Sequence, residues 1–137
     1  MTNRTLAQSY LIKASKRLKV LDVLMQEQAY SDVIRESQEI VELALKGMLR
    51  EIGIEPPKWH DVSGLVTSHK DRFPAEVAVA TAKIEEISKW LRKEREFSFY
   101  GDIDFIPTEE YTREDAMRAM NGAHLIAGLA AVVIRLQ

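Results

Sequence analysis

The chain has 137 residues, a net charge of −2, and 46% hydrophobic and 29% charged residues. This composition is typical of one globular domain, so residues 1–137 are expected to form a single domain. The near-neutral charge excludes a global basic field, and any nucleic-acid site would have to be a local patch. Because cysteine is absent, disulfides, thiolate metal ligands and cysteine nucleophiles are excluded.

The first half of the chain shows two amphipathic helical patterns. Apolar residues spaced by three and four predict one helix from Thr5 to Met25 and a second from about Asp32 to Ile52. Ser31 is the predicted N-cap of the second helix. Gly53 and the Pro56-Pro57 pair are expected to end it, because proline lacks the amide hydrogen and clashes with the preceding turn.

The second half predicts a short helix around residues 62–66, a long helix from Pro74 to Glu96 and a final helix from Thr112 to the C-terminus. Thr112 and Asp115 have the spacing of a capping box. Between the long helices lies a loop from Phe97 to Tyr111, and loops of this length are often functional. The pattern as a whole predicts an all-α, up-and-down bundle of about five helices.

The segment "KEREFSFYGDIDF", residues 93–105, is the candidate site. Arg92 and Arg95 lie three residues apart, so both could bind a phosphate, or both could belong to a solvated helix end. The aromatic residues 97, 99 and 100 could stack on bases, although packing at the end of the bundle is the commoner use. Asp102 is expected to form a turn with Gly101 rather than a cation site.

The three histidines, His60, His69 and His124, lack the paired spacing of a metal site, so no metal is predicted. No phosphate loop, dinucleotide fingerprint or nucleophile elbow is present, and no cofactor is predicted. His60 follows the double proline and precedes the short helix, where its side chain could cap or bridge backbone groups. The N-terminus lacks a signal-like apolar stretch and no window reaches about 18 apolar residues, so we expect a cytoplasmic protein without membrane contact.

Several stretches together resemble the HEPN family, small helical domains associated with nucleotide binding and RNA cleavage. They are "YSDVIRESQEIVELALKGMLREIGIEPPKWHDV" (residues 30–62), the long helix ending in arginine, aromatics and "YGD", and "PTEEYTREDAMRAM". The resemblance covers nearly the whole chain. It implies dimerisation through the later helices, which fits the apolar character of "AHLIAGLAAVVIRL", so a homodimer is expected.

In nuclease members of that family, an arginine is followed four to six residues later by a histidine. Arg95 matches the arginine, but Tyr100 stands where the histidine would be. A tyrosine hydroxyl, with an ordinary pKa near 10, is a poor proton carrier at neutral pH. We therefore predict no catalytic residue, and assign ligand binding to Arg92, Arg95, Tyr100 and Asp102.

The leading hypothesis is a HEPN-type dimer that binds a nucleotide or another phosphate-bearing ligand, or that partners a minimal nucleotidyltransferase. One alternative is a metal-independent ribonuclease toxin of a toxin–antitoxin pair, which would use Arg95 with Tyr100 or another residue on RNA. The other alternative is a purely structural interaction module.

Overall fold

The computed structural model describes residues 3–136, and within them it is entirely helical, with no strand. The all-α prediction is confirmed. The α-helices are α1 (Asn3–Gln26), α2 (Tyr30–Glu51), α3 (Ser63–Ser68), α4 (Ala75–Ala78), α5 (Thr81–Phe99), α6 (Pro107–Glu110) and α7 (Arg113–Val133), and a 3-10 helix, η1 (Lys70–Arg72), follows α3.

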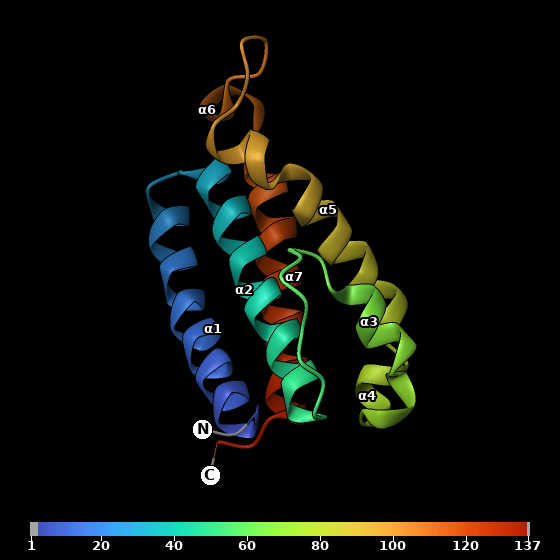
Figure 1. The fold of residues 1–137 in the computed structure, drawn as a ribbon. Helices are drawn as coiled ribbons and strands as arrows, with labels where there is room; N and C mark the ends of the chain where they lie inside the picture. The colour runs from blue at the N-terminus through green and yellow to red at the C-terminus, as the bar shows by residue number, and fades with distance from the viewer. Residues whose placement is uncertain (1–2, 137) are drawn as a thin grey trace.

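The four long helices α1, α2, α5 and α7 form a bundle, with α3 and α4 beside one end of α5 (Figure 1). α2 is the central element, because it packs against α1, α5 and α7. Its buried apolar residues lie on more than one face, as expected for a helix surrounded by others: Val33, Ile34, Ile40, Val41, Ala44, Leu45, Met48 and Leu49. The start of α1 and the end of α7 lie at one end of the bundle, and the α5–α6 connection projects from the other (Figure 1).

Two local predictions in α2 and α5 are wrong. The helix predicted from Pro74 to Glu96 is broken at residues 79–80, which separate α4 from α5. The N-cap position of α2 is Ala29, without a side-chain cap bond, and Ser31 is buried inside the first turn. The capping box of α7 is confirmed, since Thr112 Oγ1 accepts from the Asp115 amide at 3.2 Å and Asp115 Oδ2 accepts from the Thr112 amide at 3.0 Å.

The connection after α5 is shorter than predicted, because α5 continues to Phe99. Asp102 and Phe105 exchange two backbone hydrogen bonds of 2.9 and 3.0 Å, which close a tight turn. Gly101 has φ +71°, and a Cβ there would lie 2.5 Å from the Phe105 carbonyl oxygen, so the turn requires glycine. Phe105 packs against Phe97, yet Phe97 and Phe99 remain about half exposed, so the expected aromatic plug forms only in part.

α7 bears on the expectation that no segment of the chain is apolar enough to span a membrane. By length and composition alone it is apolar enough to cross a membrane, with a mean hydropathy of 1.3, and 39% of the apolar window is buried. The core helix of a soluble protein meets the same criterion. In this fold the buried face of α7, which includes Ala119, Ala123 and Ile126, packs mainly against α2.

Candidate functional site

Arg95 is the only charged residue among the buried side chains of the described chain, with 7% of its surface exposed. The reason is its position on α5, where the buried residues are Ile84, Ser88, Leu91, Arg95 and Ser98, spaced by four and three. Arg95 therefore lies on the stripe that faces α2. A buried guanidinium must find partners there, because an unpaired buried charge is strongly destabilising.

Those partners come from two other parts of the chain. Arg95 Nη2 donates to Glu39 Oε1 of α2 at 2.8 Å. Arg95 Nη1 lies 2.9 Å from Nδ1 and 3.2 Å from Nε2 of His60, in the segment between α2 and α3. Residues 35 and 56 positions away in sequence thus meet at one guanidinium.

The His60 ring is oriented by Glu42, whose Oε1 lies 2.9 Å from Nδ1. An arginine can only donate, so the ring nitrogen that faces Arg95 must accept. With the hydrogen on Nδ1 and donated to Glu42, Nε2 is the nitrogen that accepts from Arg95, at 3.2 Å, and the 2.9 Å approach of Arg95 Nη1 to Nδ1 is then not a hydrogen bond. Gln38 Nε2 adds a bond of 3.4 Å to the His60 carbonyl oxygen, which fixes the backbone of this residue on α2.

Glu42 is held in its ionised form. Burial alone would raise the pKa of this carboxyl, but hydrogen bonds from His60, Lys46 and Gln38 outweigh it and hold the pKa below its ordinary value. Lys46 Nζ donates to Glu42 Oε2 at 2.9 Å. The imidazole of His60 therefore stands between an arginine and a carboxylate, an arrangement that suits proton transfer as well as anion binding.

A pocket of about 210 Å³ opens beside this cluster. It is lined by Arg35, His60, Arg95, Glu96 and Tyr100. The guanidinium carbon of Arg35 lies 4.6 Å from the centre of the Phe99 ring, a cation–π distance.

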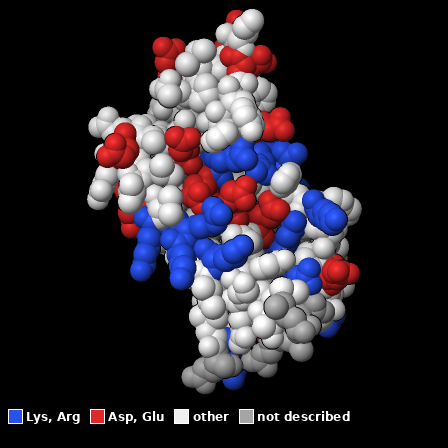
Figure 2. Space-filling model, turned by 60° about the vertical axis from the view of Figure 1, so that its left-hand side comes forward, with Lys and Arg blue, Asp and Glu red and all other residues white. Residues whose placement is uncertain are grey.

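Figure 2 shows acidic side chains gathered in the middle of one face of the molecule, with lysine and arginine side chains on several sides of them. Two guanidiniums and an imidazole can bind an oxyanion, and the exposed Tyr100 offers a ring to a base.

The four residues assigned to ligand binding from the sequence do not all meet. Arg95 and Tyr100 line the same pocket, whereas Arg92 and Asp102 do not. Arg92 is half-buried on α5, and Asp102 is exposed in the turn, where its Oδ1 accepts from the Ile103 amide at 2.7 Å. A ligand-binding role for any of the four remains a prediction.

Arg35, Glu39 and Glu42 were not predicted from the sequence as site residues, and His60 was predicted only to cap or bridge backbone groups. A signal was present: charged or polar residues interrupt the α2 pattern on the side that faces α5. The amide of Ser63, the first residue of α3, donates instead to Oδ1 of Asp61 at 3.0 Å, while the N-cap position itself is Val62 and has no side-chain cap bond.

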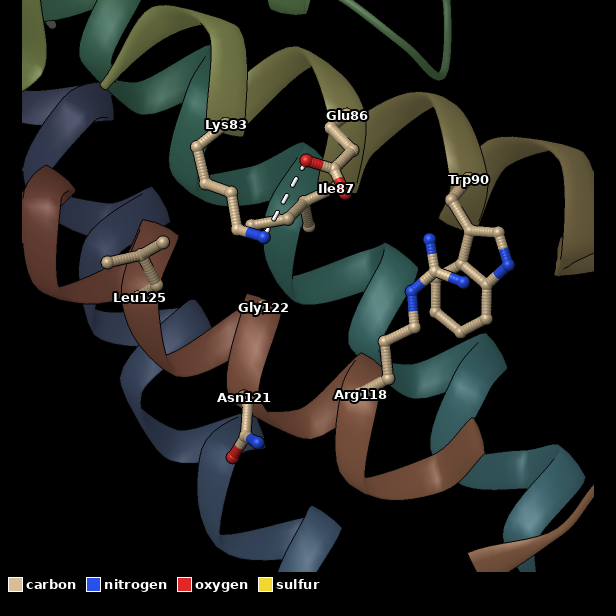
Figure 3. A pocket seen from close by; sticks show the side chains of 8 residues that line it. All are labelled: Lys83, Glu86, Ile87, Trp90, Arg118, Asn121, Gly122 and Leu125. Carbon is tan, nitrogen blue, oxygen red and sulfur yellow. Dashed lines mark ion pairs between the residues drawn. The ribbon is translucent and has the colours of Figure 1, made fainter. Parts of the chain in front are cut away.

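A second, larger hollow of about 390 Å³ lies between α5 and α7 (Figure 3). The guanidinium carbon of Arg118 lies 3.9 Å from the centre of the Trp90 ring. Lys83 Nζ forms an ion pair with Glu86 Oε2 at 3.6 Å. Its remaining lining is Ile87, Asn121, Gly122 and Leu125. This groove is mainly apolar and has no cluster like that of Arg95. Across residues 3–136, no group of three or more His, Cys, Asp or Glu side chains is arranged to hold a metal ion.

Comparison with known proteins gives one family and one curated relative. The family model described as "HEPN domain" matches residues 7–131. The chain is 29% identical over 124 residues to the protein named "Putative toxin MJ1304" of Methanocaldococcus jannaschii, an alignment that covers 85% of this chain and 80% of that protein. No solved structure matches the chain.

Proposed function

Because the chain belongs to the HEPN domain family, we propose that it binds a phosphate-bearing ligand, a nucleotide or an RNA, in the pocket of Arg35, Arg95 and Tyr100. The observation that carries this proposal is the buried Arg95, whose guanidinium faces the pocket beside His60. Guanidinium groups bind phosphate oxygens through paired, charge-assisted hydrogen bonds. The pocket therefore combines anion recognition with an aromatic surface for a base.

Titration of AMP into the protein, followed by calorimetry, tests the proposal. We expect Arg95→Ala to weaken binding by about 1.5 to 3 kcal/mol, the value of a hydrogen bond to a charged group. Arg35→Ala should weaken it as well, and this variant changes a more exposed side chain. Arg118→Ala is the matched control, since this arginine also covers an aromatic ring but lies in the other groove. Unchanged AMP affinity in both pocket variants would refute the proposal.

Arg92 and Asp102 enter the proposal as the outer end of the site. Arg92 lies one turn before Arg95 on α5 and Asp102 follows the end of that helix, and neither lines the pocket. A ligand longer than one nucleotide would have to leave the pocket along this end of the bundle. Arg92→Ala should then weaken the binding of a short oligoribonucleotide but not the binding of AMP. An equal loss of affinity for both probes would assign this arginine to the pocket itself.

RNA cleavage is a second candidate function, and His60 is the observation that favours it. The histidine lacking at position 100 has a counterpart here from a distant part of the sequence, since His60 contacts Arg95. With a phosphate held by Arg95, Nε2 could take the proton of a ribose 2′-hydroxyl as its oxygen attacks phosphorus. The bond to the 5′ oxygen breaks, and that oxygen takes a proton from water. The toxin name of the relative agrees with such an activity.

Cleavage of a generic RNA in the presence of EDTA separates this candidate from binding alone. With ligand binding as the sole function, the wild type stays at background. With His60 as the proton acceptor, the wild type cleaves and His60→Ala does not, while both still bind AMP. Tyr100→His is a useful third protein, because it restores a histidine at the position that nuclease members of the family use.

A second copy of this chain is the proposed partner at α7. Leu125 and Val132 on this helix are 41% and 47% exposed, and Leu125 borders the groove shared with α5. A homodimer through these helices would cover the exposed apolar residues and bury more than about 1,200 Å². Leu125→Asp should then yield a particle of 15.6 kDa by light scattering. A wild-type monomer at micromolar concentration would contradict the dimer.

A minimal nucleotidyltransferase is the proposed heterologous partner, as the family resemblance implies. Co-purification with the product of an adjacent nucleotidyltransferase gene would support it. A protein that binds neither phosphate ligands nor this partner, and cleaves no RNA, would leave the purely structural interaction module.

A further inference from the structure

The two arginines of the pocket share one carboxylate oxygen. Glu39 Oε1 accepts from Arg95 Nη2 at 2.8 Å, and the same oxygen lies 4.0 Å from Arg35 Nε. One arginine comes from α2 and the other from α5. The carboxylate therefore lies between two cations of different helices, both of which line the pocket.

The three side chains differ in their freedom to move. The Arg95 side chain is 8% exposed and enclosed by α2, whereas the Glu39 side chain is 34% exposed. Arg35 is intermediate in exposure at 26%. Glu39 can therefore rotate towards solvent around its own side-chain bonds, while Arg95 stays in place. Because arginine cannot lose its proton in a protein, the site left by Glu39 keeps its positive charge and requires another anion.

We propose that Glu39 is an internal competitor that occupies the anion site, and that the phosphate group of the ligand replaces it between Arg35 and Arg95. This inference rests on the proposed function and states where the phosphate binds. The exchange favours ligands that carry more charge than the carboxylate they displace. A terminal phosphate has a charge of about −1.5 to −2 at pH 7, whereas an internal phosphodiester has one negative charge. The preferred ligands are therefore mononucleotides and phosphorylated RNA ends.

Calorimetric titration of two probes tests this assignment: AMP, which has a terminal phosphate, and the dinucleotide ApA, which has only an internal phosphodiester. The variant is Glu39→Gln, which keeps the shape and one oxygen acceptor for Arg95 but removes the charge. We expect AMP to bind the variant about tenfold more tightly than the wild type, because the competitor is neutralised. The wild-type preference for AMP over ApA should shrink in the variant, since a monoanion no longer has to displace a carboxylate.

Glu36→Gln is the matched control, because Glu36 lies three residues earlier on α2 and pairs with Arg17 at 2.8 Å, away from the pocket. The affinity of the Glu36→Gln variant for AMP should equal that of the wild type. Glu39→Asp provides a second variant if Glu39→Gln does not fold; its shorter side chain reaches Arg95 less well, and AMP affinity should again rise.

The outcomes separate the two proposals. If AMP binds the wild type and binds Glu39→Gln equally or more weakly, Glu39 merely supports Arg95 and the competitor proposal is overturned, while the proposed function stands. The same holds if the wild type binds ApA as tightly as AMP. If neither probe binds the wild type or the variant, the proposed function fails and this inference fails with it.

Discussion

His60 and Asp61 are neighbours in the sequence, yet their side chains join two different polar clusters. The Asp61 cluster comprises Ser63, Ser88 and Lys89: Asp61 Oδ1 accepts from the hydroxyls of Ser63 and Ser88 at 2.6 and 2.7 Å. Its Oδ2 lies 3.8 Å from Lys89 Nζ, and the Asp61 side chain is 22% exposed. The His60 side chain is 46% exposed and opens onto the Arg95 pocket.

The difference lies in how completely each cluster satisfies its own charge. Burial alone would raise the pKa of Asp61, but the hydrogen bonds of Ser63 and Ser88 outweigh it and hold the pKa below its ordinary value. Both hydroxyls of this cluster donate to one oxygen of Asp61, and the cluster fastens the start of α3 to α5. The Arg95 cluster is instead open to solvent on the side of His60. The two adjacent residues thus separate a structural contact from a candidate site.

Among the variants that test this difference between the two clusters, Asp61→Ala is expected to have the largest effect on stability. The substitution leaves the hydroxyls of Ser63 and Ser88 buried without their acceptor. We expect the free energy of unfolding to fall by about 2 to 4 kcal/mol in urea denaturation. Asp71→Ala, on the exposed η1 segment, should change it by less than about 0.5 kcal/mol. Equal losses in both variants would show that the Asp61 cluster does not fasten α3.

Acid should weaken both clusters gradually. The pKa values of Glu42 and Asp61 are lowered from ordinary values of 4.5 and 3.8, so the unfolded chain binds protons more readily than the folded one. Their contribution to stability is therefore complete above about pH 5.5 and is lost as the pH falls through the lowered values. Urea unfolding between pH 7 and pH 3 should show this decline, and Glu42→Gln should reduce its slope. A free energy that rises towards acid would contradict the assignment.

The helices of the bundle could be predicted because their cause is local. Apolar spacing placed the four long helices, and the Thr112–Asp115 capping box placed the start of α7. The break between α4 and α5 could not be foreseen from the same rule. The apolar stripe through Val77, Ala80 and Ile84 continues across it, and neither glycine nor proline marks residues 79–80.

The candidate site was predicted only where it is local to the end of α5. Arg95 and Tyr100 are five residues apart and were assigned together. Glu39 and His60 reach Arg95 from 56 and 35 residues away, through the packing of α2 against α5. A pattern within one helix holds no information on such a contact. The search for a histidine close to Arg95 in sequence therefore did not find the histidine close to it in space.

The smallest effect on stability is expected from His60→Gln, and it bears most directly on the contrast between the two neighbours. Because the imidazole is nearly half exposed, the loss of its contacts with Glu42 and Arg95 should lower the free energy of unfolding by less than about 1 kcal/mol. The same variant should abolish RNA cleavage if His60 carries the proton, since an amide cannot do so at neutral pH. Urea denaturation and an RNA cleavage assay on one preparation give both readings. A loss as large as that of Asp61→Ala would make His60 a structural residue too, and cleavage that survives in His60→Gln would place the chemistry at another residue.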